Sequence, residues 1–138
     1  MMSEVSVPYH LIIPFLISFG LLCLGIKKII KLKNSGRKRF LIAIITFCSL
    51  YSLTTGYSVY ESIVIPIKIN RFDLNNDGMI SDQEETKELV TLRWKLISDT
   101  ARNFSFITGF IFSFIFAFTI YLILTLNAFI LGKLKLNF

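Results

Sequence analysis

A short polar stretch between strongly apolar segments reads DLNNDGMISDQE and occupies residues 73–84. Its glycine stands where the backbone must turn sharply with a positive φ, which glycine adopts without a steric clash. Oxygen ligands are available at six positions: Asp73, Asn75, Asp77, Met79, Ser81 and Glu84. Met79 can offer only its carbonyl, Ser81 a hydroxyl or a bridging water, and Glu84 both carboxylate oxygens. This arrangement suits a hard cation that takes about six to eight oxygen ligands at 2.3–2.6 Å.

The stretch resembles the EF-hand calcium loop, because it fills every defining position of the pattern D-x-[DN]-x-[DN]-G-x5-E. The resemblance covers about residues 61–93 and implies a Ca²⁺ site between an entering and an exiting helix. Apolar residues occupy the flanking positions that such helices turn inward: Ile69, Phe72, Ile80, Leu89 and Leu92. Ser81 and Glu84 form an S-x-x-E capping box, so we expect the exiting helix to begin at the last ligand. The alternative is a metal-free Asp/Asn/Gly turn, but such a turn does not require Glu84.

The rest of the chain has the composition of a membrane protein. Hydrophobic residues make up 54% of its 138 residues and charged residues only 17%. Apolar segments long enough to cross a bilayer occupy residues 10–27, 40–60 and 104–131, and the second is expected to continue as a helix toward Pro66. The sequence therefore predicts an all-α integral membrane protein in which an EF-hand helix–loop–helix connects the second and third of three transmembrane helices. The expected division is residues 1–67, 68–102 and 103–138.

The polar region at 68–102 has 35 residues, fewer than the roughly 40 below which a domain usually needs outside help to fold. Residues 72–88 contain six acids and one base, a local net charge of −5 that attracts a cation. Residues 83–102 contain neither proline nor glycine and place Leu89, Leu92 and Leu96 on one face. We therefore expect one amphipathic exiting helix, stabilised by metal, bilayer or partner.

The basic residues are unevenly distributed. Seven of fifteen lie within residues 27–39, between two apolar segments, and Lys133 and Lys135 follow the third. The positive-inside rule places this loop and the C-terminus in the cytoplasm and the calcium loop on the extracytoplasmic side. The charge is not a nucleic-acid signal, because no recognition fold accompanies it. Cys23 and Cys48 lie inside apolar segments and suggest neither a disulfide framework nor a zinc site.

The second apolar segment carries a polar face. Hydroxyl-bearing residues recur at helical spacing: Tyr51, Thr54, Thr55, Ser58 and Ser62. In lipid this face must turn toward protein or water, so it serves either as packing contact between helices or as a solute or ion pathway. Glu61 is expected at the outer interface.

Three functions follow from these features. The first is a non-enzymatic accessory or assembly subunit with a structural Ca²⁺ site, within a homo-oligomer or a larger membrane complex. The second is a Ca²⁺ sensor that regulates a channel or transporter. The third is an ion channel formed by oligomerisation around the polar face. An enzyme is not indicated, because the only histidine, His10, lies far in sequence from the acids.

Overall fold

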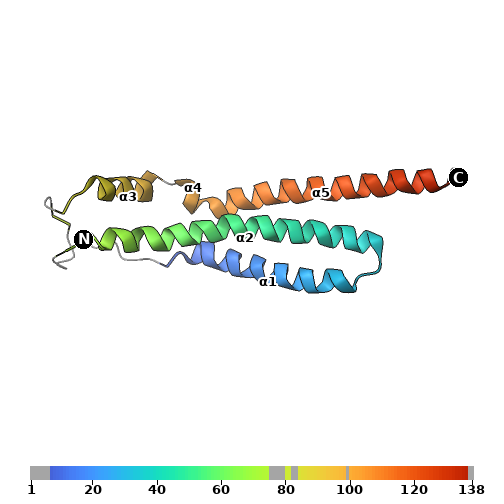
Figure 1. The fold of residues 1–138 in the computed structure, drawn as a ribbon, viewed down its shortest axis with the longest axis horizontal. Coiled ribbons are helices and arrows are strands. Elements are labelled where there is room, and N and C mark those ends of the chain that lie inside the picture. Colours follow the sequence, from blue (N-terminus) through green and yellow to red (C-terminus); the bar gives the residue numbers. More distant parts are fainter. Residues whose placement is uncertain (1–6, 75–79, 82–83, 99, 137–138) are drawn as a thin grey trace.

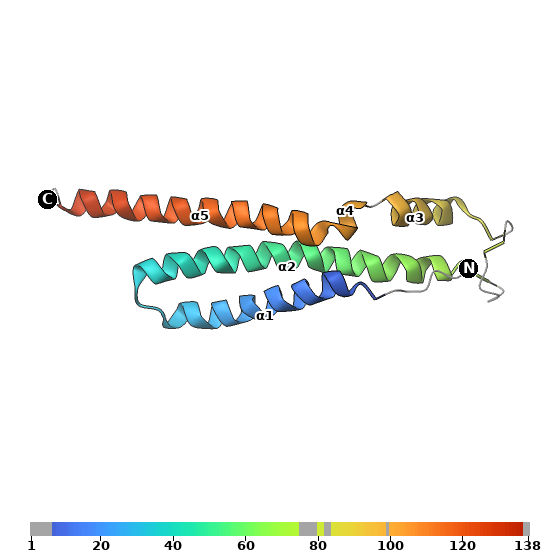
Figure 2. The same cartoon turned by 180° about the vertical axis from the view of Figure 1, so that it is seen from behind.

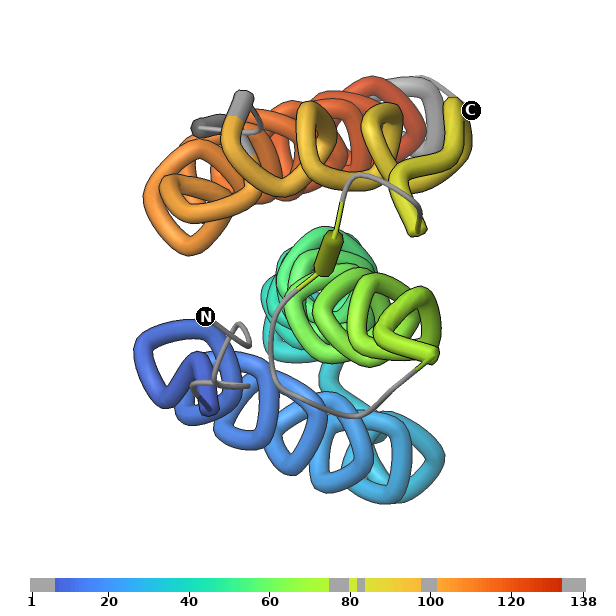
Figure 3. Tube along the Cα trace, turned by 90° about the vertical axis from the view of Figure 1, so that its left-hand side faces the viewer, coloured from blue at the N-terminus to red at the C-terminus, as the bar shows by residue number. Residues whose placement is uncertain are grey.

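The computed structural model describes residues 7–74, 80–81, 84–98 and 100–136, and within these ranges it contains helices and no strand. The helices are α1 (Tyr9–Lys31), α2 (Ser35–Asn70), α3 (Lys87–Ser98), α4 (Thr100–Asn103) and α5 (Ser105–Leu136). Helix α2 lies in the centre, with α1 along one side and α3 and α5 along the other (Figures 1 and 3). The predicted all-helical fold is confirmed. Apolar 18-residue windows within α1, α2 and α5 have mean hydropathies of 2.1, 1.6 and 2.3, which are compatible with three membrane crossings.

Different elements lie at the two ends of the molecule. The α1–α2 connection and the C-terminal end of α5 lie at one end, whereas α3 lies at the other (Figures 1 and 2). The basic connection is shorter than expected, because only residues 32–34 separate the two helices. Asn34 begins α2 by accepting hydrogen bonds from the backbone N–H groups of Gly36 and Arg37 at 3.0 and 3.2 Å. Gly36 therefore lies inside the first turn of α2 and does not interrupt the helix.

Helix α2 is much longer than a bilayer requires. Its 36 residues, at 1.5 Å each, span about 54 Å, whereas the hydrocarbon core is about 30 Å thick. The helix continues through Pro66, which lacks the N–H that would bond to the carbonyl of Ser62. Apolar packing of Ile65 and Ile69 against α3 offsets this loss. One continuous helix thus connects the apolar bundle to residue 70, where the acidic loop follows.

Close approach of small residues holds α1 and α5 against α2. Ser18 of α1 and Ser52 of α2 share a buried hydrogen bond of 2.8 Å between their hydroxyl oxygens. On the other side of α2, a Cβ added to Gly109 of α5 would stand 2.6 Å from Oγ1 of Thr54. In lipid, where apolar burial gives little driving force, such backbone contact and interhelical hydrogen bonding supply the attraction.

The exiting segment differs from the single helix expected over residues 83–102. Helix α3 begins at Lys87 and ends at Ser98, and α4 and α5 follow as separate elements. The expected start at Glu84 is wrong. Glu84 lies in a turn, and Thr86 instead caps α3 by accepting a hydrogen bond from the N–H of Leu89 at 3.2 Å. The Glu84 side chain forms the capping-box contact with Ser81, and it also accepts a hydrogen bond from the backbone of Leu74 on the other side of the loop.

Candidate functional site

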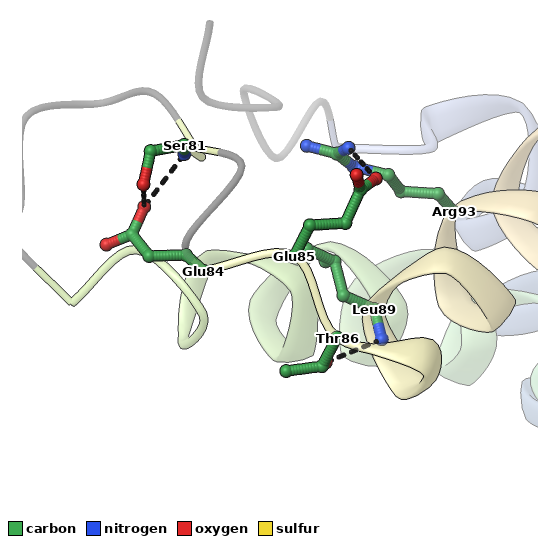
Figure 4. A network of polar contacts seen from close by, with 6 residues as sticks. All are labelled: Ser81, Glu84, Glu85, Thr86, Leu89 and Arg93. Atoms are coloured by element: carbon green, nitrogen blue, oxygen red, sulfur yellow. Dashed lines mark hydrogen bonds and ion pairs between the residues drawn. The ribbon is translucent and has the colours of Figure 1, made fainter.

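The carboxylate of Glu84 connects the two sides of the acidic loop. Its Oε1 accepts a hydrogen bond of 2.8 Å from the backbone N–H of Leu74, ten residues earlier. Its Oε2 accepts bonds from the backbone N–H and the hydroxyl of Ser81 at 2.9 and 3.0 Å (Figure 4). The carboxylate of Glu84, the twelfth loop position, is thereby held beside Leu74, which follows the first position, Asp73. The loop is closed by the residue that the sequence predicts to be its last ligand.

The first and last acids of the loop are both buried. Asp73 is 6% exposed and Glu84 is 8% exposed. Removing carboxylates from water is costly unless hydrogen bonds or cations compensate them. The three bonds to Glu84 supply part of that compensation, and charge-assisted bonds of this kind are stronger than neutral ones. Two buried carboxylates thus lie at the two ends of the loop, where a bound cation would add to this compensation.

An apolar cluster below the loop positions its two flanking helices. Ile65 and Ile69 of α2 and Leu89 of α3 form its buried centre. Partly buried side chains complete it: Phe72, Ile80, Leu92 and Leu96. All five apolar residues that the EF-hand pattern predicts to face inward pack in this cluster: Ile69, Phe72, Ile80, Leu89 and Leu92. This cluster fixes α3 against the end of α2.

The ligand set is described only in part. Asp73, Ser81 and Glu84 fall within the described residues, whereas Asn75, Asp77 and Met79 lie outside them. Among the described residues, no three His, Cys, Asp or Glu side chains gather as a metal site. The donors that are described are carboxylate and hydroxyl oxygens, which is the chemistry that Ca²⁺ takes. These residues therefore fit a hard divalent cation.

An ion pair between α2 and α3 joins a buried acid to a half-exposed lysine and was not expected from the sequence. Glu61 of α2 is 7% exposed and accepts hydrogen bonds from Lys95 of α3 at 2.5 Å and from the Tyr57 hydroxyl at 2.7 Å. The spacing of Tyr57 and Glu61, one helical turn, was visible in the sequence. The Lys95 contact was not, because it depends on the direction in which α3 folds back. The pair ties the exiting helix to α2 independently of the acidic loop.

A cavity of about 390 Å³ lies next to this pair, between α2 and the start of α5. Ser58 and Glu61 line it from α2, and Arg102 and Ser105 line it from α4 and α5. Arg102 is 6% exposed and donates a hydrogen bond to the carbonyl of Leu96 at 3.1 Å. The cavity thus places charged and hydroxyl groups at the level where α5 begins.

The polar face of α2 makes contacts between and within helices. The Tyr51 hydroxyl donates to the carbonyl of Phe106 in α5 at 3.1 Å. Thr55 and Ser58 donate to carbonyls one turn earlier in α2, at 2.7 and 3.1 Å. Both side chains are buried. Tyr51 thus takes part in packing against α5, whereas the hydroxyls of Thr55 and Ser58 are satisfied within α2.

Comparison of the chain with protein-family models, with curated proteins and with solved structures found no match.

Proposed function

We propose that this chain is a non-enzymatic, calcium-binding, multi-pass membrane protein whose single EF-hand-like helix–loop–helix holds a structural Ca²⁺ ion. The observation that carries the proposal is the Glu84 carboxylate, which reaches across a loop with the complete EF-hand ligand pattern and joins its two sides. Asp73, Ser81 and Glu84, with Asn75, Asp77 and Met79, would hold the ion. Bound Ca²⁺ would supply the positive charge that the two buried acids favour.

The charge distribution supports an orientation with the loop outside the cytoplasm. Residues 27–39 carry seven basic residues, and Lys133 and Lys135 add two at the same end of the molecule, against six in residues 68–102. Extracellular calcium modules have dissociation constants of about 10⁻⁴–10⁻³ M. A site of about 10⁻⁴ M in about 1 mM calcium would be mostly occupied and would stabilise the folded protein by about 1.4 kcal/mol. A site that is mostly occupied stabilises the helix–loop–helix and responds little to changes in calcium concentration. This behaviour suits an accessory subunit.

Calcium titration of two matched variants tests the proposal. Glu84→Gln removes the bidentate carboxylate, whereas Glu88→Gln removes the same charge from an exposed position on α3. We expect Glu84→Gln to weaken calcium binding by about 100-fold, since the amide keeps one neutral oxygen ligand but loses the second oxygen and the negative charge. Glu88→Gln should retain the wild-type affinity within about twofold, the effect of one screened surface charge. Calorimetry on the purified full chain measures both, and wild-type protein that binds no calcium at millimolar concentration would refute the proposal.

A sensor that regulates a membrane channel or transporter is the second candidate. It is favoured by the continuity of α2 from the apolar bundle to the loop, because a changed angle between α2 and α3 would be transmitted along one rigid element. The affinity separates the two candidates. Binding in the micromolar range, together with a calcium-dependent rearrangement of α3, would support the sensor and contradict the structural site.

A further inference from the structure

A basic cavity opens at the end of the molecule opposite the acidic loop. Its volume is about 570 Å³, within the range of ligand sites. Lys28 from the last turn of α1 and Arg37 from the first turn of α2 line it, together with Tyr121 of α5. The N–H groups of Gly36 and Arg37 are already bonded to Asn34. The attraction that this cavity exerts on an anion therefore comes from the two side-chain cations.

An apolar cavity of about 420 Å³ adjoins the basic one between α2 and α5. The two share Phe40, Ile44 and Tyr121 as lining residues. The phenyl ring of Phe40 and the phenol of Tyr121 pack edge to face with centroids 6.3 Å apart at this junction. Beyond them the lining is aliphatic or aromatic: Ala43, Phe47, Phe114, Ala117 and Phe118. A charged entrance and an apolar interior thus follow one another along the bundle.

The helices that form this entrance carry no acidic side chain near it. The sequence contains no Asp or Glu in residues 5–60 or 100–138, which include α1, all of α5 and α2 up to Tyr60. Within the described residues, the ion pairs are Glu61 with Lys95 and Glu85 with Arg93, and both involve α3 at the other end. Among the described residues no side chain supplies a counter-charge to Lys28 and Arg37, so an anion from another molecule would meet no competing acid of these helices.

We propose that the two cavities together bind one anionic phospholipid. Its phosphate lies between Lys28 and Arg37, and one acyl chain enters the apolar cavity beside Ala117. Arginine and lysine at a membrane boundary are the usual partners of lipid phosphate. An alkyl chain needs no hydrogen-bond partner, whereas a peptide segment in the same place would have to satisfy its backbone groups. The site does not depend on calcium.

Lipid titration of the purified full chain in detergent, read by native mass spectrometry, tests the headgroup contact. The probes are dioleoyl phosphatidylglycerol and dioleoyl phosphatidylcholine. We expect one phosphatidylglycerol to bind preferentially, and the pair Lys28→Gln with Arg37→Gln to weaken its binding by about tenfold, as expected for the loss of charge-assisted contacts. The matched control, Lys33→Gln with Lys38→Gln, removes two nearby exposed charges that do not line the cavity and should leave binding within about twofold. An equal loss in both pairs, or equal binding of phosphatidylcholine, would overturn the proposal.

A second pair of variants tests the acyl-chain contact. Ala117→Leu places extra side-chain volume in the apolar cavity, whereas Ala128→Leu makes the same change on α5 away from it. We expect only Ala117→Leu to weaken phosphatidylglycerol binding. Unchanged binding in Ala117→Leu, with full competition by inorganic phosphate, would indicate a soluble-anion site and would refute the lipid. A lipid-free dimer that Ala117→Leu abolishes would place a second copy in the groove and would equally refute it.

Discussion

At the scale of single residues, Glu61 and Lys95 form an asymmetric pair. The Glu61 side chain is 9% exposed, whereas that of Lys95 is 49% exposed. A buried acid loses its hydration free energy on folding, and the attraction to its partner must compensate for that cost. A half-exposed lysine keeps most of its hydration and can turn to solvent when the acid is removed. The two single substitutions should therefore differ in cost although they remove the same contact.

We predict that Lys95→Met destabilises the protein by about 2 kcal/mol, because it leaves the Glu61 charge buried without its ammonium partner. Glu61→Gln should cost only about 1 kcal/mol, since the amide oxygen can still accept from Tyr57 and Lys95 can reach water. Detergent unfolding followed by the fluorescence of Trp94, the only tryptophan, measures both. The double variant should resemble Glu61→Gln alone. Equal costs for the two single variants would contradict the asymmetry.

At the scale of elements, the contact between α2 and α5 depends on the absence of a side chain at Gly109. An added Cβ would stand 2.6 Å from Oγ1 and 3.3 Å from Cβ of Thr54. The Thr54 hydroxyl donates to the carbonyl of Tyr51 at 3.0 Å, so its rotation would break that bond. A methyl group at this position therefore requires either the loss of that bond or a separation of the two helices.

Gly109→Ala is therefore expected to destabilise the bundle by about 1–3 kcal/mol, the usual cost of overpacking. Gly20→Ala in α1 serves as control, because a Cβ there would meet nothing within 4 Å. That variant should be neutral or slightly stabilising, since alanine favours the helix over glycine. Helix content during detergent unfolding reports both changes. A Gly109→Ala protein as stable as the Gly20→Ala control would show that α2 and α5 do not approach closely at this position.

The elements also show which parts of the fold the sequence makes predictable. Hydropathy and length indicate the three long helices, and the EF-hand pattern indicates which apolar side chains, such as Ile69 and Leu89, meet under the loop. The break between α3 and α5 was missed, because no proline or glycine marks it. The second apolar segment and the entering helix of the EF-hand pattern together predict a long α2, although Pro66 is a local signal for a helix end that tertiary packing overrides. Contacts between distant segments, Glu61 with Lys95 above all, depend on the fold and leave no periodic pattern.

At the scale of the whole molecule, charge is separated along the long axis. The basic connection between α1 and α2 lies at one end with the C-terminal end of α5, and the acidic loop is attached at the other (Figure 1). A bilayer across the three apolar helices would divide these ends between its two sides. The lipid site proposed at the basic end and the calcium site proposed at the acidic end would then face different compartments.

This separation predicts how the orientation depends on charge. Single cysteines at Lys33 and Glu88, in protein whose Cys23 and Cys48 are replaced by alanine, give opposite labelling by an impermeant reagent in intact cells. We expect Glu88→Cys to be labelled from outside and Lys33→Cys only after permeabilisation, because basic loops stay in the cytoplasm.

Replacing Lys31, Arg37, Lys38 and Arg39 with glutamine reverses the balance. It reduces the basic residues at the α1–α2 end, counting Lys133 and Lys135, from nine to five, fewer than the six in residues 68–102. A substantial fraction of this variant should then carry Glu88→Cys on the inside. As control, glutamine at four of the six basic residues in residues 68–102 should leave the orientation unchanged. In the protein that keeps all its basic residues, labelling of Glu88→Cys only after permeabilisation would place the acidic loop in the cytoplasm. A cytoplasmic loop would be expected to bind calcium with the micromolar affinity of a sensor, not as a structural site.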